Sequence, residues 1–112
     1  MSAPVLNRRL VLEEETRLHD GAGGWSREWH GLGTLWAQVS ARSARERDVD
    51  GRERSRVSHR ITVRAAPYGS QRRPRADQRL RDGARVFLIR GVGEADVRGA
   101  FLTIWADEEI AS

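Results

Sequence analysis

Arginine is the residue type in this sequence with the clearest capacity for binding chemistry. All 20 basic side chains are arginine, and none is lysine. The guanidinium group is planar and presents five donors in a fixed arrangement, which suits phosphate and carboxylate oxygens. A GC-rich genome also replaces lysine by arginine without a functional cause. The positions of the arginines are therefore more informative than their number.

The positive charge is concentrated in the middle of the chain. Residues 42–60 contain seven arginines and four acids, a net charge of +3, and residues 72–85 contain six arginines and two aspartates, a net charge of +4. The two ends are mildly acidic, with net charges of −1 over residues 1–41 and −3 over residues 86–112. The two central segments are thus the candidates for binding phosphate or carboxylate groups.

Catalytic and metal-binding patterns are weak by comparison. The chain has no cysteine, and its three histidines, His19, His30 and His59, lack the spacing that places two ligands on one helix face. None of the candidate serines has the glycine-flanked context of an activated nucleophile. These serines are Ser26, Ser40, Ser43 and Ser55. We expect a protein that is not an enzyme and that uses no cofactor or metal.

The length and composition indicate one small domain. A chain of 112 residues fits a single hydrophobic core. It is 38% hydrophobic and 32% charged, and no apolar window approaches the roughly 18 residues of a membrane span. The N-terminus lacks the charged-then-apolar pattern of a signal sequence. We expect no membrane partner and a protein that stays in the compartment where it is made.

Apolar residues that alternate with polar ones predict β-strands. The clearest case is residues 34–41, where Leu35, Ala37 and Val39 face one way and Trp36 faces the other. Residues 60–66 alternate in the same way, and residues 86–89 are apolar on both sides, which predicts burial on both. The remaining predicted strands are residues 5–13, 25–29, 78–80 and 101–105.

Turns and loops separate these strands. Asp20-Gly21 and Gly23-Gly24 predict a turn before residue 25, and Asp82-Gly83 predicts a hairpin turn. Residues 67–74 and 91–100 are read as connections. Residues 42–58 contain almost nothing apolar and are expected to form a long mobile loop between two strands.

About six short strands without a helix predict an all-β fold. We expect residues 1–112 to form one small antiparallel β-barrel or sandwich with the loop of residues 42–58 inserted between strands. A closed barrel removes the exposed strand edges of a short open sheet. The core is thin for this length, and four tryptophans exceed what it needs, so we expect assembly into an oligomer.

A series of short motifs also resembles a known family. In chain order they are residues 6–12, the Asp-Gly turn at 20–24 followed by Trp29, the Leu-Trp-Ala-Gln-Val strand at 35–39, Arg45-Glu46, the strand at 59–64, residues 79–87 and the acidic pair Glu108-Glu109. Together they resemble the head-tail joining proteins of tailed bacteriophages and gene transfer agents, also called head completion or stopper proteins. The resemblance extends from residue 6 to residue 109.

The resemblance implies a structural role in a virion or phage-like particle assembled in the bacterial cytoplasm. Such a protein forms a homo-oligomeric ring, expected here with six or twelve copies, between the adaptor and portal proteins and the tail terminator or tail tube proteins. Packaged double-stranded DNA passes through the ring, and the long loop points into this channel. The counterpart here is residues 42–58, with Arg42, Arg45, Arg47, Arg52, Arg54 and Arg56 as the candidate DNA-channel residues.

Four further residues are candidates for subunit or partner contacts. Trp36 is expected outside the barrel, although it could instead pack beneath the N-terminal segment. Arg72, Arg73 and Arg75 could contact DNA phosphates or pair with Glu108 and Glu109 of a neighbouring copy. Each charged residue is also compatible with an ordinary solvated loop.

A free-standing nucleic-acid-binding barrel of OB or SH3-like type is the alternative function. Such a barrel uses a basic face with exposed aromatic side chains on which bases stack. Tyr68, beside Arg72 and Arg73, is the aromatic residue with the right surroundings for this role.

Overall fold

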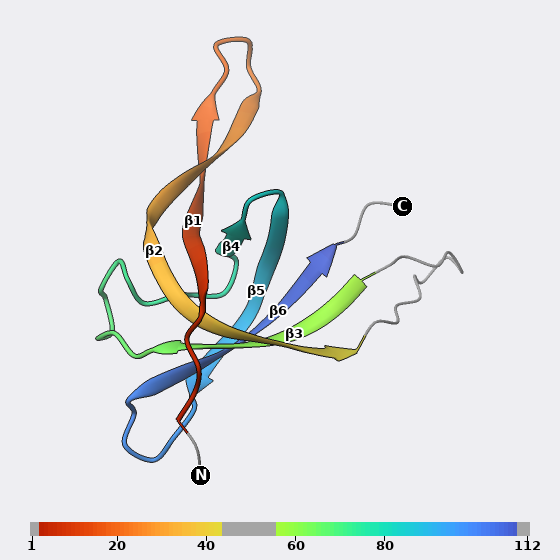
Figure 1. The fold of residues 1–112 in the computed structure, drawn as a ribbon. Helices are drawn as coiled ribbons and strands as arrows, with labels where there is room; N and C mark the ends of the chain where they lie inside the picture. Colours follow the sequence, from red (N-terminus) through yellow and green to blue (C-terminus); the bar gives the residue numbers. More distant parts are fainter. Residues whose placement is uncertain (1–2, 44–55, 110–112) are drawn as a thin grey trace.

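Six alternating segments form six antiparallel strands that close into a barrel (Figure 1). The computed structural model describes residues 3–43 and 56–109, and this part of the chain contains no helix, hence none that could cross a membrane. The strands are β1 (Arg8–His19), β2 (Trp25–Ser43), β3 (Arg56–Arg64), β4 (Arg79–Asp82), β5 (Arg85–Glu94) and β6 (Phe101–Glu109). Their order around the barrel is β1-β2-β3-β6-β5-β4. The predicted all-β barrel is confirmed.

The barrel interior is filled by one layer of apolar side chains from all six strands. Alternation places Ile61 and Val63 inside, as predicted, and Leu35 and Val39 pack against the buried Ala37. The buried hydrophobic residues are Leu10, Leu12, Ala37, Ile61, Val63, Leu80, Phe87, Ile89, Leu102, Ile104 and Ala106. Phe87 is the largest fully buried side chain. This core is small for a chain of 112 residues, as the composition of the sequence predicted.

Strand β2 is longer than the sequence pattern indicated. The two strands expected at residues 25–29 and 34–41 form one strand of 19 residues. The pairing with β1 continues through Gly33 and Gly31, with a register shift that leaves Leu32 as an extra residue. Gly33 has φ of 149°, which an L side chain rarely adopts, so the glycine allows the bulge without ending the strand.

Strands β1 and β2 extend beyond the barrel as a two-stranded ribbon. β1 pairs with β4 only from Val11 to Glu13, and β2 pairs with β3 only from Ala37 onward. Residues 14–30, here called the arm, therefore project away from the barrel (orange in Figure 1). At its tip, Asp20 Oδ1 accepts hydrogen bonds from the backbone N–H groups of Ala22 and Gly24. The turn predicted there is present.

Two expectations about strand limits and one about burial are corrected. Arg42 and Ser43 belong to β2, and residues 56–58 belong to β3, so these residues of the expected loop 42–58 are in strands; residues 44–55 lie outside the described residues. β5 continues through a register shift near Arg90 to Glu94, and the connection to β6 is residues 95–100. Val86 and Leu88 are only half-buried, because the outer side of a single-layer barrel faces solvent.

Candidate functional site

Two of the predicted DNA-channel arginines, Arg42 and Arg56, belong to strands at one end of the barrel, where β2 ends and β3 begins. Arg42 is exposed near the end of β2, and Arg56 is the first residue of β3. Arg45, Arg47, Arg52 and Arg54 lie outside the described residues, as does the side chain of Arg56. Since Arg56 pairs with Glu109, the last residues of β6 reach the same end of the barrel.

A charged cluster, buried at Glu108 and His59 and half exposed at Arg85, lies at this end of the barrel interior. The Arg85 guanidinium donates to Glu108 Oε2 and Oε1 at 2.7 and 2.9 Å, and His59 Nε2 lies 3.0 Å from Glu108 Oε1. Glu108 and His59 are 8% and 5% exposed. Phe87 packs edge-on against the His59 ring. The cluster ties β3, β5 and β6 together beside the ends from which residues 44–55 depart.

The electrostatics of Glu108 follow from this geometry. The hydrogen bonds from Arg85 lower the pKa of Glu108 below its ordinary value, burial opposes this effect, and the contact with His59 lowers it further. The hydrogen bonds to Glu108 and its negative charge in turn raise the pKa of Arg85. His59 Nδ1 is buried without a hydrogen-bond partner among the described residues. Both carboxylate oxygens of Glu108 are thus used within the chain, which disfavours the expected pairing with arginines of a neighbouring copy.

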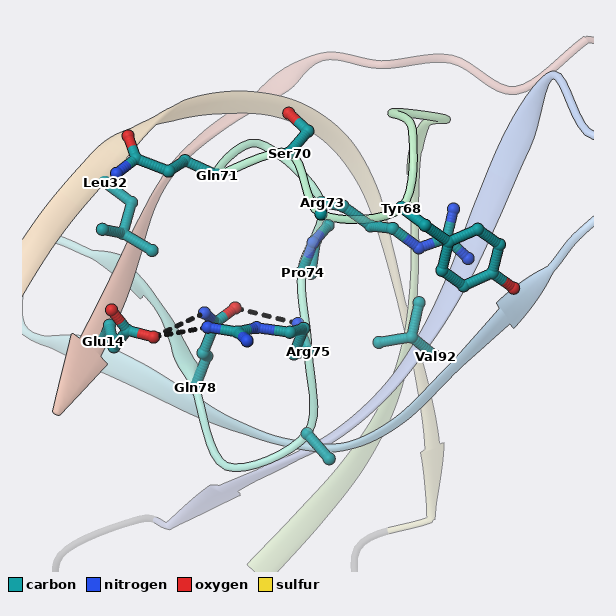
Figure 2. A pocket seen from close by; sticks show the side chains of 12 residues that line it. Glu14, Leu32, Tyr68, Ser70, Gln71, Arg73, Pro74, Arg75, Gln78 and Val92 are labelled. Atoms are coloured by element: carbon teal, nitrogen blue, oxygen red, sulfur yellow. Dashed lines mark hydrogen bonds and ion pairs between the residues drawn. The ribbon is translucent and has the colours of Figure 1, made fainter.

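Arg73 and Arg75 line a pocket of about 450 Å³ (Figure 2). Arg75 donates to Glu14 Oε1 at 2.6 Å, and the buried Gln78 side chain accepts a hydrogen bond from the Arg75 backbone N–H. Arg73 donates to the Ala66 carbonyl at 2.9 Å. Arg72 is exposed. Arg75 therefore ties the loop of residues 65–78 to β1, while Arg73 joins two parts of the loop to each other.

Tyr68 is not placed as a free stacking platform. Its side chain is 81% exposed, but the Arg73 guanidinium lies 3.7 Å from the centre of its ring. One face of the ring is therefore occupied by a cation–π contact within the chain. This arrangement weakens the alternative in which Tyr68 stacks on nucleic-acid bases.

Trp36 lies on the outside of the barrel, as alternation predicted. Its side chain is 54% exposed, and it pairs with Arg9 of β1 across the strands. The N-terminal segment passes nearby, because the Val5 backbone N–H donates to Gln38 Oε1 at 2.8 Å. More than half of the indole remains open to solvent. Trp36 is thus available for contact with another molecule.

Alternation in the sequence places Arg60 and Arg64 on the outside, but sequence reasoning did not single out the outward residues of β3 and β6 as a surface. Trp105 is 47% exposed and pairs with the exposed Arg60, while the exposed Arg64 lies 5.9 Å from the centre of the Phe101 ring. With Arg9 of β1 and Trp36 of β2, these residues give the outer side of β1, β2, β3 and β6 an aromatic and positively charged character. The signal was present in the sequence, since Arg60 and Arg64 alternate with inward Ile61 and Val63.

The contacts at the base of the arm were also missed. Glu13, only 6% exposed, accepts hydrogen bonds from Arg79 at 2.6 Å and Arg81 at 3.0 Å. Burial raises the pKa of Glu13, but the hydrogen bonds and positive charges of Arg79 and Arg81 bring it below the ordinary value. The spacing of Arg79 and Arg81 is the sequence signal, because period two places both on one side of a strand.

The three histidines are far from forming a common site. His19 stacks on Trp25 with ring centroids 3.9 Å apart, and His30 lies 2.7 Å from Thr16 Oγ1. Within residues 3–43 and 56–109, no three histidine, aspartate or glutamate side chains are grouped as metal ligands would be.

Comparisons with known proteins identify similar chains. A family model described as phage head completion protein matches residues 1–109. A solved structure described as "Virion of native gene transfer agent (GTA) particle" contains a chain with 47% sequence identity and a TM-score of 0.86, covering 98% of this chain and 100% of that chain. No curated protein matches this sequence.

Proposed function

Because this chain belongs to the phage head completion protein family, we propose that it acts as a stopper, a ring that joins the portal-adaptor complex to the tail and retains packaged DNA. The chain is a structural component of a virion or phage-like particle, and it associates with other virion proteins there. The observation that carries the proposal is the match in fold and sequence over almost the full length to a chain in a gene transfer agent virion.

The shape and surface of the barrel support assembly into a ring. Its core is a single small layer, whereas Trp36, Trp105 and Trp25 are each about half exposed or more. Tryptophan is enriched at protein interfaces, where it contributes large buried areas. Repeated subunit contacts would cover these side chains and stabilise a marginal monomer. Rings of six or twelve copies are the assemblies that we propose.

The DNA-retaining element in this proposal is the arginine-rich segment between β2 and β3. Arg42 and Arg56 stand at its two ends, and the proposal adds Arg45, Arg47, Arg52 and Arg54 from the sequence between them. In a ring, the copies would repeat these charges around the DNA. Contacts with phosphates are independent of base sequence. The four acids of the segment weaken each contact, which lets DNA leave when the tail opens.

Deletion of residues 45–54 tests this function. We expect the barrel to fold and the ring to dock, because the strand pairs from Ala37–Val63 to Ser43–Ser58 lie outside the deletion. DNA should leak from filled heads, and the yield of infectious or transducing particles should fall. As a matched control, residues 45–54 are replaced by a Gly/Ser segment of the same length. This variant removes the arginines but keeps the length of the segment. Full DNA retention by both variants would overturn the retaining role of this segment.

The alternative function, a free-standing nucleic-acid-binding barrel, makes a different prediction. It requires a monomer or dimer with salt-dependent affinity for free DNA. Arg73, Arg75, Arg79, Arg81 and Arg85 are all engaged with other groups of this chain. Much of the positive charge at residues 72–85 is therefore neutralised in the fold, which favours the virion role.

A further inference from the structure

The arm of residues 14–30 is an exposed structure with little support from its own barrel. It is a two-stranded ribbon, and such ribbons are marginally stable in water without further packing. Leu18 and Trp25, close to its tip, are 45% and 60% exposed. The arm therefore presents apolar surface at a distance from the core.

Contacts on both sides fix the direction of the arm at its base. On one side, the Arg79 guanidinium lies 4.2 Å from the centre of the Trp29 ring and also donates to Glu13. On the other side, Arg75 and the buried Gln78 donate to Glu14. A ribbon held in this way meets a partner in a defined orientation and loses little conformational entropy on binding.

The two faces of the arm differ in chemistry. Cross-strand partners share a face, so Leu18 lies with Ser26, and Thr16 lies with Glu28. This side, here called the Leu18 face, also bears Glu14 and His30 but neither arginine of the arm. Arg17 and Arg27 pair with each other on the opposite side. The Leu18 face thus combines an exposed apolar side chain with the negative charge of Glu28, which is half exposed.

The outer side of the barrel offers the complementary surface. We call it the Trp-Arg face, and it consists of Arg9, Trp36, Arg60, Arg64 and Trp105. All five are exposed. A nearby acid on this side, Asp107, already accepts hydrogen bonds from Arg90 and Ser58. The Trp-Arg face therefore carries a net positive charge together with open aromatic rings.

We propose that the Leu18 face of the arm docks on the Trp-Arg face of an adjacent copy of this chain. The proposal rests on the ring assembly of the proposed function and specifies which surfaces build it. A ring of more than two identical copies needs two different surfaces on each copy, since a surface that binds itself produces only pairs. The arm and the Trp-Arg face are two such surfaces, and their charges and apolar groups match.

The composition of the Trp-Arg face favours a protein partner over DNA. Two half-exposed indoles gain most from an apolar partner surface, which the phosphate backbone of a duplex lacks. Tryptophan and arginine together are the residues most enriched at the energetic centres of protein interfaces. Leu18 of a second copy supplies the apolar group, and Glu28 supplies a charge opposite to those of Arg60 and Arg64.

Cysteine cross-linking in purified particles tests this contact. The chain has no cysteine, so two engineered ones are unique. Ser26→Cys lies on the Leu18 face, and Ser40→Cys pairs with Arg60 beside the Trp-Arg face; both positions are exposed. With a short bismaleimide, the double variant should give a ladder of covalent oligomers up to the ring size. Each single variant should remain monomeric, and so should Ser26→Cys combined with Ala84→Cys, an exposed position in the β4–β5 turn across the barrel from β3.

A charge exchange checks whether the same contact depends on opposite charges on the two faces. In the double-cysteine background, Glu28→Arg and Arg64→Glu should each reduce the ladder at least tenfold. Their combination should restore a substantial part of it. All the substituted side chains are exposed, so the barrel should fold in every variant.

The outcomes separate the docking proposal from the ring itself. A ring visible by electron microscopy in particles that give no ladder would overturn the docking proposal and leave the stopper function intact. Dimers from Ser26→Cys alone, equal cross-linking through Ala84→Cys, or a cross-link to another virion protein would also overturn it. Particles that contain no ring of this chain would overturn the proposed function.

Discussion

Arg85 and Glu108 form a bidentate ion pair inside one end of the barrel, with N–O distances of 2.7 and 2.9 Å. Glu108 belongs to the acidic end of β6, which from sequence alone could equally have paired with a neighbouring copy. The fold directs it inward instead, because it continues the inward alternation of Leu102, Ile104 and Ala106. The pair stabilises the strands next to the segment to which we assign DNA retention.

Stability should fall in acid because of Glu108 and Glu13. Both have a folded-state pKa below the value of about 4.3 that a glutamate has in an unfolded chain. Their stabilising contribution is therefore present above that value and is lost as the pH falls through the folded pKa. We expect the free energy of unfolding, measured with urea, to be constant near neutral pH and to decrease below about pH 4.5. A protein equally stable at pH 3 and pH 7 would contradict the assignment.

Removing the charge of Glu108 should destabilise the barrel at neutral pH. Glu108→Gln leaves Arg85 without its counter-charge and weakens the contact with His59, and we expect a loss of about 2 kcal/mol in the free energy of unfolding. Urea denaturation at pH 7 measures the loss. Glu94→Gln is the matched control, because Glu94 is exposed in β5. If both variants lose the same free energy, the buried pair has no special role.

Truncating a side chain of the core should lower the free energy of unfolding more than Glu108→Gln does. Phe87→Ala removes the largest buried side chain and the ring that packs against His59, and we expect a cost of about 3 to 5 kcal/mol. In a chain with so small a core, the isolated variant should be largely unfolded at 37 °C. Circular dichroism of the purified protein with temperature checks this. A melting temperature equal to that of the wild type would show that the barrel core lies elsewhere.

Trp36→Ala should weaken assembly into particles without affecting the folding of the isolated chain. The side chain is outside the barrel, so the isolated variant should keep its free energy of unfolding within about 0.5 kcal/mol. If Trp36 lies at the centre of an interface, its truncation should weaken the contact by about 2 kcal/mol or more and lower the amount of the protein in purified particles. Val97→Ala, at a fully exposed position, should have no effect. Normal particle assembly by Trp36→Ala would exclude it from a subunit or partner contact.

The sequence predicted the strands and the core well, because local alternation is enough to define both. Leu35, Ala37, Ile61 and Val63 face inward as expected, and the Asp20 turn is in place. The continuous β2 was not predictable by pattern, since Gly31 and Gly33 resemble a strand break and only the pairing with β1 carries the strand across them.

The candidate contacts were harder to predict, because they depend on residues distant in the chain. Arg75 reaches Glu14 and Arg79 reaches Glu13 across more than 60 positions, so charge counts alone treated these arginines as free. Arg42 was placed in a loop because the end of β2 has no apolar alternation beyond Ala41. The arm became apparent only when the partial pairing of β1 with β4 was known.

Electron microscopy of purified particles tests the central claim most directly, because it shows position, copy number and loop direction in one reconstruction. Our account predicts a closed ring of this chain between the portal-adaptor complex and the tail, with the ends of β2 and β3 directed toward the DNA channel. Density for this chain anywhere outside the head-tail junction, or as isolated copies without ring symmetry, would contradict it.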